Sequence, residues 1–223
     1  MKCKSLVVGT FLAAMGLGMQ PAFANLVTNG DFSGGNTGFT SSYTYTAFIN
    51  SETQYTIVPA ASINTINAYG DWTAVSTDPL GGNGNVLAAN GATSPNTVVW
   101  QEIVTVTPNT NYSFSFYGVD VNAAKVSNAT LQPEVNGITG ALLYTSQAWQ
   151  QNSSFIWNSG ASTSATLTLT DVNTSATFND FALDYIGFNA VGAPGPGPGT
   201  GLLSLAFLIL AGSMTRARGF LAR

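Results

Sequence analysis

The side chains that could perform chemistry in this sequence are ten carboxylates, with no histidine to assist them. The chain of 223 residues has a single cysteine, Cys3, close to its start. These absences exclude Ser-His and Cys-His nucleophilic catalysis, and zinc sites built from imidazole or thiolate groups. Two carboxylates could still hydrolyse a glycosidic bond, but the spacing of the acidic residues favours no pair over another. We therefore predict that the protein is not an enzyme.

Aromatic and amide side chains form the other chemically useful set, and they suit a sugar ligand. A pyranose ring presents a C–H face that stacks on an aromatic ring and a polar edge that hydrogen-bonds to amides and carboxylates. The candidate carbohydrate-binding residues are Tyr117, Trp72, Trp100 and Trp149, and glutamine or glutamate side chains follow the last two directly. Core packing is the alternative role for each of these tryptophans.

The basic residues lie almost wholly outside the segment that holds the acidic ones. All ten acidic residues fall between Asp31 and Asp184, where the only basic residue is Lys125. Binding to nucleic acid or to anionic lipid needs clustered Lys and Arg side chains. The acidic segment is therefore predicted to bind neither of them.

Alternating side chains predict strands for the body of the chain, residues 25–191. In NYSFSFYG (111–118), Tyr112, Phe114 and Phe116 alternate with serines, so that Tyr117 falls on the opposite, more exposed face. Further strands are predicted at 39–49, 54–58, 72–75, 85–90, 98–106, 129–135, 141–146, 153–157, 165–170 and 180–188. Turn signals such as Asn136-Gly137 separate them. So many short strands predict an all-β fold, an antiparallel β-sandwich.

The first 24 residues have the layout of a signal peptide. Lys2 and Lys4 form a basic n-region, an apolar helix is predicted from about residue 6 to residue 19, and Ala22-Phe23-Ala24 is a signal-peptidase site. We expect signal peptidase to cleave after Ala24. The protein is therefore predicted to be exported, with the mature chain beginning at residue 25.

The end of the chain has the layout of a transient anchor. A Pro/Gly linker (192–200) precedes a short hydrophobic helix and a basic tail (201–223). The apolar run from 201 to 214 would be about 21 Å long as a helix, which is short for a hydrocarbon core of ~30 Å. Arg216, Arg218 and Arg223 would hold its end on the cytoplasmic side. Removal by a transpeptidase-like enzyme is predicted, and a permanent anchor is the alternative.

Three stretches resemble known families. NLVTNGDFSGGNTGF (25–39) resembles the opening of carbohydrate-binding modules of the galactose-binding-like jelly-roll type, and NDFALDYIGF (179–188) resembles their closing strand. The tail resembles a PEP-CTERM sorting signal in which Pro196-Gly197-Pro198 replaces Pro-Glu-Pro. The resemblance implies a Gram-negative source, processing by an exosortase-like enzyme, and a location at the cell-envelope surface or outside the cell after transient anchoring in the inner membrane.

The resemblance also implies a structural calcium ion between the first and the last strand. The ligands that it implies are Asp31 and Asp184, together with nearby main-chain carbonyls. Ser33 and Tyr185 stand where the family usually has carboxylates, and Phe39 stands where it usually has tryptophan. Calcium is the only cofactor that the sequence implies.

Two orientations of the closing strand remain open. If Ile186 and the aromatic residue two positions beyond it face the core, Asp184 shares their face and needs a metal ion, N–H donors or a proton. If Phe181, Leu183 and Tyr185 face inward instead, Asp184 is solvated.

Three functions follow from these observations. The first is an exported, non-catalytic protein that binds glycan or forms part of an exopolysaccharide matrix. The alternative is a structural coat or adhesin module that acts through protein–protein contacts, for which strand faces rich in Thr and Ser are suited. The third, least favoured function is that of a glycan hydrolase.

Overall fold

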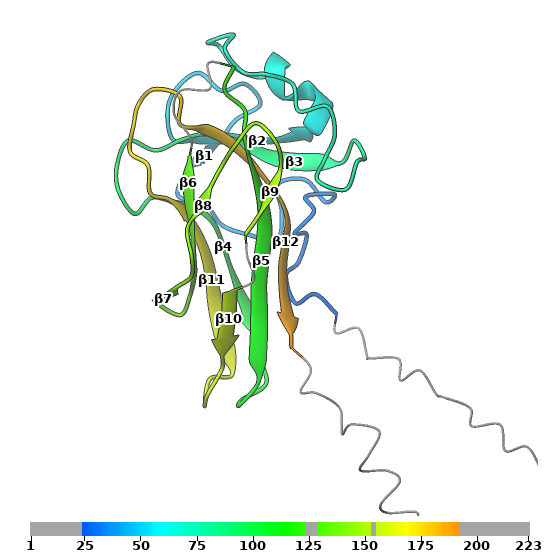
Figure 1. Cartoon of the computed structure of the whole chain (residues 1–223), viewed down its shortest axis with the longest axis vertical. Helices are drawn as coiled ribbons and strands as arrows, with labels where there is room; N and C mark the ends of the chain where they lie inside the picture. The colour runs from blue at the N-terminus through cyan, green and yellow to red at the C-terminus, as the bar shows by residue number, and fades with distance from the viewer. Residues whose placement is uncertain (1–23, 124–128, 153–154, 192–223) are drawn as a thin grey trace, which may run out of the picture.

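The computed structural model describes residues 24–123, 129–152 and 155–191, which form a two-layer β-sandwich (Figure 1). One short 3-10 helix, η1 (Ala60–Thr65), accompanies the strands. The strands are β1 (Thr44–Tyr45), β2 (Gln54–Pro59), β3 (Asn85–Asn90), β4 (Val98–Thr105), β5 (Asn111–Asp120), β6 (Thr130–Val135), β7 (Ile138–Thr139), β8 (Leu143–Tyr144), β9 (Gln150–Gln151), β10 (Phe155–Asn158), β11 (Ser164–Asp171) and β12 (Asp180–Ala190).

The predicted terminal segments lie outside the described residues. These are the signal-peptide helix, the Pro/Gly linker and the C-terminal hydrophobic helix, with the processing positions Ala22, Pro196, Gly197 and Pro198. Within the part of the chain that the structure describes, no helix has the length and apolar character to cross a membrane.

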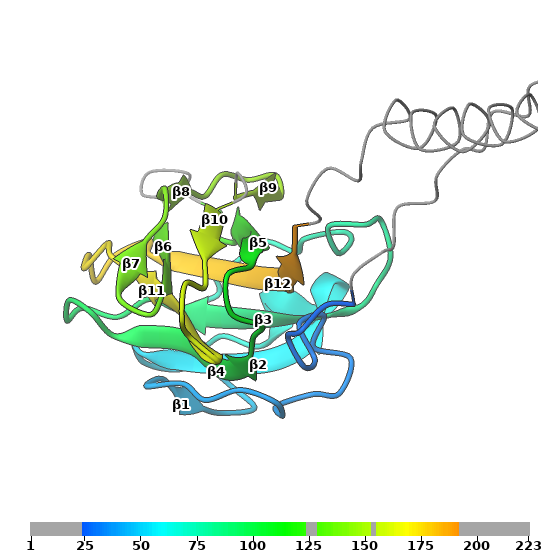
Figure 2. The same ribbon diagram turned by 90° about the horizontal axis from the view of Figure 1, so that it is seen from below.

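The strands form two sheets that face each other (Figures 1 and 2). The seven-stranded sheet has the order β1-β2-β3-β12-β5-β10, with β9 also paired to β5. The five-stranded sheet has the order β4-β11-β6-β7, with β8 also paired to β6. From β3 to β6 and from β10 to β12, successive strands alternate between the two sheets, which is the jelly-roll arrangement. The prediction of an antiparallel β-sandwich of jelly-roll type is confirmed.

The main core fills the space between the sheets. Tyr112, Phe114 and Phe116 of β5 point into it, as their alternation predicts. Phe188 of β12 stacks on Tyr112 with 4.9 Å between ring centroids, and Trp100 of β4 packs 6.4 Å from Phe114. Burying each large apolar side chain contributes about 1.5–3 kcal/mol. This aromatic layer therefore holds the two sheets together without a disulfide.

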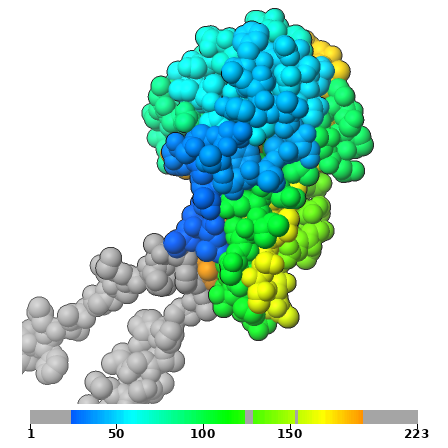
Figure 3. Space-filling view, turned by 180° about the vertical axis from the view of Figure 1, so that it is seen from behind, coloured from blue at the N-terminus to red at the C-terminus, as the bar shows by residue number. Residues whose placement is uncertain are grey.

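A second, smaller core covers part of the outer face of the seven-stranded sheet. Helix η1 and the segment that follows it lie on this face, so that Ile63 and Trp72 pack against Val119 of β5 and Ala182 of β12. In Figure 3 the residues of the N-terminal third, in blue and cyan, gather over this end of the molecule, while the green and yellow strands project below. The part of this outer face that the helix and the following segment leave uncovered is half-buried.

Strand β12 contains a β-bulge in its middle. Its register against β5 shifts between Asp184 and Gly187, and Tyr185 has a φ of 47°. An extra residue in a strand reverses which side chains face inward. Leu183 and Ile186 therefore both point into the main core, although an unbroken strand would place them on opposite faces.

The N-terminal segment runs beside the end of β12 and is hydrogen-bonded to it. The Asn25 side chain donates from Nδ2 to the oxygen of Ile186 (3.1 Å) and accepts from the Phe188 N–H (2.9 Å). The Ile186 N–H donates to the oxygen of Gly30 (2.8 Å). A Cβ atom on Gly30 would lie 2.0 Å from the Ile186 oxygen, so the close approach of these two segments requires glycine.

Three of the predicted strands differ from the structure. The segment 39–49 contributes the short strand β1 and single bridges at Thr40 and Ile49, and the segment 72–75 forms a single bridge between Trp72 and Asn122. The segment 141–146 contributes only the two-residue strand β8. None of these segments forms a continuous ladder of hydrogen bonds with a neighbouring strand.

Candidate functional site

The outer face of the seven-stranded sheet carries the candidate site, and β9 positions its central aromatic residue. Strand β9 pairs Gln151 with Tyr117 and Gln150 with Gly118. Directly paired residues of two strands point to the same face. Trp149, which precedes β9, therefore comes beside Val119 on the same face as Tyr117, and its ring packs against the second core.

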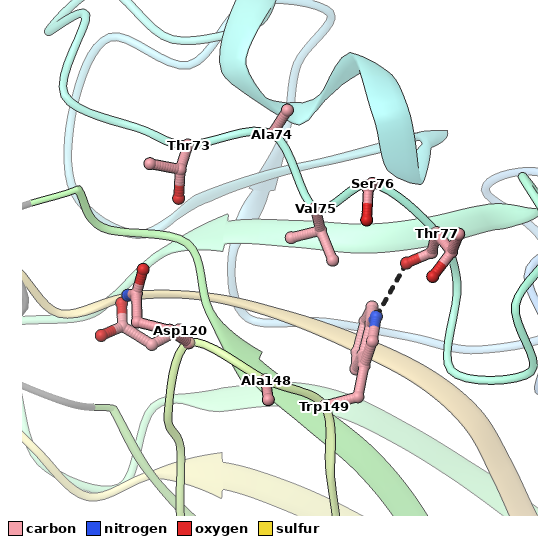
Figure 4. Close-up of a pocket in the computed structure, with 9 residues that line it drawn as sticks. Thr73, Ala74, Val75, Ser76, Thr77, Asp120, Ala148 and Trp149 are labelled. Atoms are coloured by element: carbon pink, nitrogen blue, oxygen red, sulfur yellow. Dashed lines mark hydrogen bonds between the residues drawn. The ribbon is translucent and has the colours of Figure 1, made fainter.

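Trp149 forms one wall of a hollow of about 430 Å³ on this face (Figure 4). The segment from Thr73 to Thr77 runs along one side, and Asp120, Ala148 and Trp149 lie on the other. The indole Nε1–H donates to the oxygen of Thr77 (2.9 Å), which fixes the ring plane. The half-buried ring thus stands beside hydroxyl, carboxylate and amide side chains, the last from Gln147.

The Asp120 carboxylate lies deep in this hollow. Asp120 is 2% exposed, its Oδ1 accepts from the Asn122 N–H (2.8 Å), and its Oδ2 is buried without a hydrogen-bond partner. Burial raises the pKa of this carboxyl group above its ordinary value, and the hydrogen bond from the Asn122 N–H partly opposes that effect. The Gln147 Nε2 lies beside the carboxylate and donates to the oxygen of Asn122 (2.8 Å).

A second hollow, of about 440 Å³, lies on the same face near the N-terminal segment. Tyr185, Gly187 and Ser115 line it from the sheet, and Asp31 lines it from the N-terminal segment. The register pairs Ser115 with Gly187 and Tyr117 with Asp184, so Tyr117 lies close along β5 to this hollow. The tyrosine at the β-bulge and Tyr117 are both half-buried.

The structure separates the four predicted carbohydrate-binding residues into two pairs. Trp149 and Tyr117 lie on the half-buried outer face. Trp100 is fully buried between the sheets, and Trp72 is 4% exposed beneath the cover. A buried ring cannot stack on a sugar, so the prediction is wrong for Trp100 and Trp72, whose role is core packing.

Several residues of the site were not predicted. Gln147, Thr77 and Asp120 come together only because two loops meet at the end of β5, and Tyr185 faces outward only because of the β-bulge. The sequence carried one usable signal, the amide residues close to Trp149 in the chain.

Neither predicted orientation of the closing strand is right for Asp184. Asp184 lies on the outer face, yet it is 1% exposed, because the bulge and the neighbouring loops enclose it. Its Oδ1 accepts from the Tyr185 N–H (2.7 Å), and its Oδ2 is buried without a partner. Burial raises the pKa of Asp184 to about 8, and the nearby charges of Asp78 and Asp31 add to this rise.

The fit of a calcium ion depends on few side chains. The described residues include no group of three or more acidic side chains placed to hold a metal ion. The unpartnered Oδ2 of Asp184 is a suitable ligand atom, whereas Asp31 is exposed and its Oδ1 accepts from the Ser33 N–H (3.2 Å) and hydroxyl (2.8 Å). An ion here would therefore rely on Asp184, Asp31 and main-chain carbonyls.

Comparisons with known proteins found similarity only among solved structures. No protein-family model matches the sequence, and no curated protein is similar enough in sequence to count as a match. The tandem CBM22-1-CBM22-2 domain of Paenibacillus barcinonensis Xyn10C is 19% identical with a TM-score of 0.48, over 81% of this chain and 50% of that one. The CBM22-1 xylan-binding domain of the same protein is 18% identical with a TM-score of 0.43, over 78% of this chain and 99% of that one.

A third similar structure is TmCBM61 in complex with β-1,4-galactotriose. It is 14% identical with a TM-score of 0.44, over 75% of this chain and 99% of that one. At these identities and TM-scores, nothing about the ligand of this chain follows from the similarity.

Proposed function

We propose that the protein is an exported, non-catalytic glycan-binding protein whose site is the outer face of the seven-stranded sheet. One observation carries the proposal: Trp149 and Tyr117 lie on the same open face, beside hollows lined with hydroxyl, amide and carboxylate groups. This pairing of an aromatic plane with polar groups at its edge suits a pyranose ring.

The proposed mechanism is weak contact at several points. The C–H face of one sugar packs on the exposed part of the Trp149 ring, which its hydrogen bond to Thr77 keeps from rotating. Hydroxyl groups of the sugar bind Gln147 and the hydroxyls of the 73–77 segment. Each such hydrogen bond contributes about 0.5–1.5 kcal/mol, so useful affinity requires an oligosaccharide that also contacts Tyr117.

The proposal includes the route of the protein to the cell surface. The signal-peptide and PEP-CTERM-like patterns support export, cleavage by signal peptidase and an exosortase-like enzyme, and display at the cell-envelope surface as part of an exopolysaccharide matrix. In this scheme only the terminal segments enter the membrane.

Affinity gels with neutral polysaccharides test the binding site. The chain from Asn25 to its C-terminus, purified in mild detergent, is compared with the Trp149→Ala, Tyr117→Ala and Tyr144→Ala variants. Tyr144 is 65% exposed on the five-stranded sheet, so it is a matched control. If a polysaccharide in the gel slows the migration of the unchanged protein, we expect the Trp149→Ala variant to bind that polysaccharide about tenfold more weakly, since a stacking contact is lost.

The other outcomes are equally clear. Equal weakening in the Tyr144→Ala variant would place the binding site elsewhere, and the thermal midpoint of each variant shows whether it is folded. Failure of every polysaccharide to retard the protein, together with self-association, would overturn the proposal in favour of the structural coat.

A further inference from the structure

Three carboxylates converge behind the hollow at Trp149. The main-chain N–H of Asn122 donates to Asp120 Oδ1 (2.8 Å), and its Nδ2 donates to Asp180 Oδ2 (3.0 Å). The Ala123 N–H donates to the main-chain oxygen of Asp71 (2.8 Å), and the charge of Asp71 raises the pKa of Asp180, so that the third carboxylate lies near the other two. The end of β5, the start of β12 and the loop before the 73–77 segment therefore meet in one acidic cluster.

No positive charge in the described part of the chain balances this acidic cluster. The residues that the structure describes include neither lysine nor arginine, and Lys125, two positions beyond Ala123, lies outside them. Asp120 Oδ2 and Asp71 Oδ1 are buried without hydrogen-bond partners. Burial raises the pKa of Asp180 to about 6, and the charges of Asp71 and Asp120 contribute to this rise. An unpartnered buried carboxylate oxygen is costly, and a cationic donor would satisfy it.

Of the three carboxylates, only that of Asp120 lines the hollow in which a sugar would bind. Asp120 lines the hollow of Trp149, whereas Asp180 is 5% exposed and does not line that hollow. Gln147 lines the same hollow, and its amide lies against the Asp120 carboxylate. Because Gln147 is exposed, a donor group carried by a ligand can take the place of its amide.

We propose, resting on the glycan-binding function proposed above, that this hollow selects glycans that carry protonated primary amines, that is, polymers of 2-amino-2-deoxy sugars that are not N-acetylated. The sugar ring packs on Trp149, and its ammonium group donates to Asp120. An ammonium is a compact cation with three donors, and its hydrogen bond to a carboxylate is charge-assisted. Glycans made of uronic acids are repelled by the same field.

Two hexamers that differ only in N-acetylation provide the test. The chain from Asn25 to its C-terminus is titrated with the glucosamine hexamer and with the N-acetylglucosamine hexamer at about pH 5.5. This pH is about two units below the pKa of about 7.7–8 of an α-amino group, which also has electron-withdrawing neighbours, so that the sugar amines are protonated. Xylohexaose and a polygalacturonate oligomer serve as neutral and anionic probes. We expect the amine hexamer to bind about tenfold more tightly than its acetylated counterpart, and the anionic oligomer to bind least.

Two charge-removing variants separate a specific contact from general attraction. Asp120→Asn keeps the acceptor for the Asn122 N–H, and Glu134→Gln removes the same charge from the five-stranded sheet. Asp120→Asn should abolish the preference for the amine hexamer, and Glu134→Gln should leave it unchanged. If both variants lose the preference for the amine hexamer equally, or if spermine competes as strongly as that hexamer does, the acidic surface attracts cations in general. Either result would overturn the inference.

The same titrations distinguish this inference from the function on which it rests. Equal binding of the two glucosamine-based hexamers, sensitive to Trp149→Ala, would overturn amine selection and support glycan binding. Failure of every hexamer to bind would overturn both.

Discussion

At the scale of single residues, Asp184 needs a partner that the described side chains do not supply. Its Oδ2 is enclosed without a donor, and Asp31 and Asp78 repel its charge. Either a proton or a cation bound to Oδ2 can remove the unfavourable burial of this charge. The proton follows from the raised pKa, and the calcium ion that the sequence resemblance implies stays a prediction.

Calcium addition tests the role of Asp184. If the ion binds there, calcium added to the EDTA-treated protein at about pH 8 should raise the thermal midpoint by about 4 °C or more, because ligand binding stabilises the folded state. The Asp184→Asn variant should lose this response, and Glu134→Gln should retain it. Scanning calorimetry measures both. The same response in wild type and Asp184→Asn would contradict the predicted site.

The residue scale also shows what the sequence could reveal about the site. Trp100 lies on the same alternation as Val104 and Val106, which are both buried, but Glu102 interrupts it, so the period-two pattern gave only a weak signal that the ring lies in the core. Trp72 gave no such signal, because it lies in a loop without alternation. Trp149 could be proposed as a binding residue, but its partner Asp120 could not, because the two meet only through the pairing of β9 with β5.

At the scale of elements, the N-terminal segment behaves as an extra strand of the seven-stranded sheet. Asn25 bonds to Ile186 and Phe188 on one edge of β12, and the Leu26 N–H donates to the oxygen of Phe188 (3.0 Å). One side chain therefore fixes the position where the mature chain is predicted to begin.

Replacing Asn25 tests this attachment. Asn25→Ala removes three hydrogen bonds, from its Nδ2 to Ile186 and from the Val27 and Phe188 N–H groups to its Oδ1. We expect the free energy of unfolding to fall by about 1–3 kcal/mol. Urea denaturation measures the loss, and Asn50→Ala, at an exposed asparagine, is the control. A change no larger than that of the control would show that the segment is held by its main chain alone.

The elements were predictable where side chains alternate over several residues. The segments 54–58, 85–90, 98–106 and 165–170 became β2, β3, β4 and β11 almost to the residue. The β-bulge in β12 was not predictable, since it depends on packing of the N-terminal segment against Gly187 and Ile186. Because of this bulge, the Asp184 side chain lies on the outer face although Ile186 points into the core.

At the scale of the whole molecule, three buried carboxyl groups make stability depend on pH. Burial raises the pKa of Asp171 to about 7, of Asp180 to about 6 and of Asp184 to about 8. Each folded-state pKa lies above the unfolded value of about 3.9. Their stabilising contribution is therefore complete below about pH 4 and is lost as the pH rises toward 6–8.

Thermal unfolding at different pH values checks this expectation. In EDTA, the midpoint should be highest at about pH 4 and should fall by about 5 °C or more by pH 8, because charged carboxylates are disfavoured in the folded state. Repulsion among the ten acidic residues acts in the same direction. A midpoint that rises between pH 4 and pH 8 would show that these carboxylates are stabilised as anions in the folded protein.

The fold class was accessible from the sequence because alternation and turn signals are local properties. The location of the site was not, because it depends on which face of the sandwich the segment around η1 covers. That choice follows from the burial of Ile63 and Trp72 against Val119, a contact between segments far apart in the chain.

The pairing of residue 26 with residue 188 places both ends of the sandwich side by side (Figure 1). A short peptide could join these ends into a closed loop, and the chain could then be opened at another exposed turn. Such a circular permutant would keep both sheets and the outer face intact. The permuted sandwich could then be made without either terminal segment, or with both segments attached at its new chain ends. The residues that form its surface would not change.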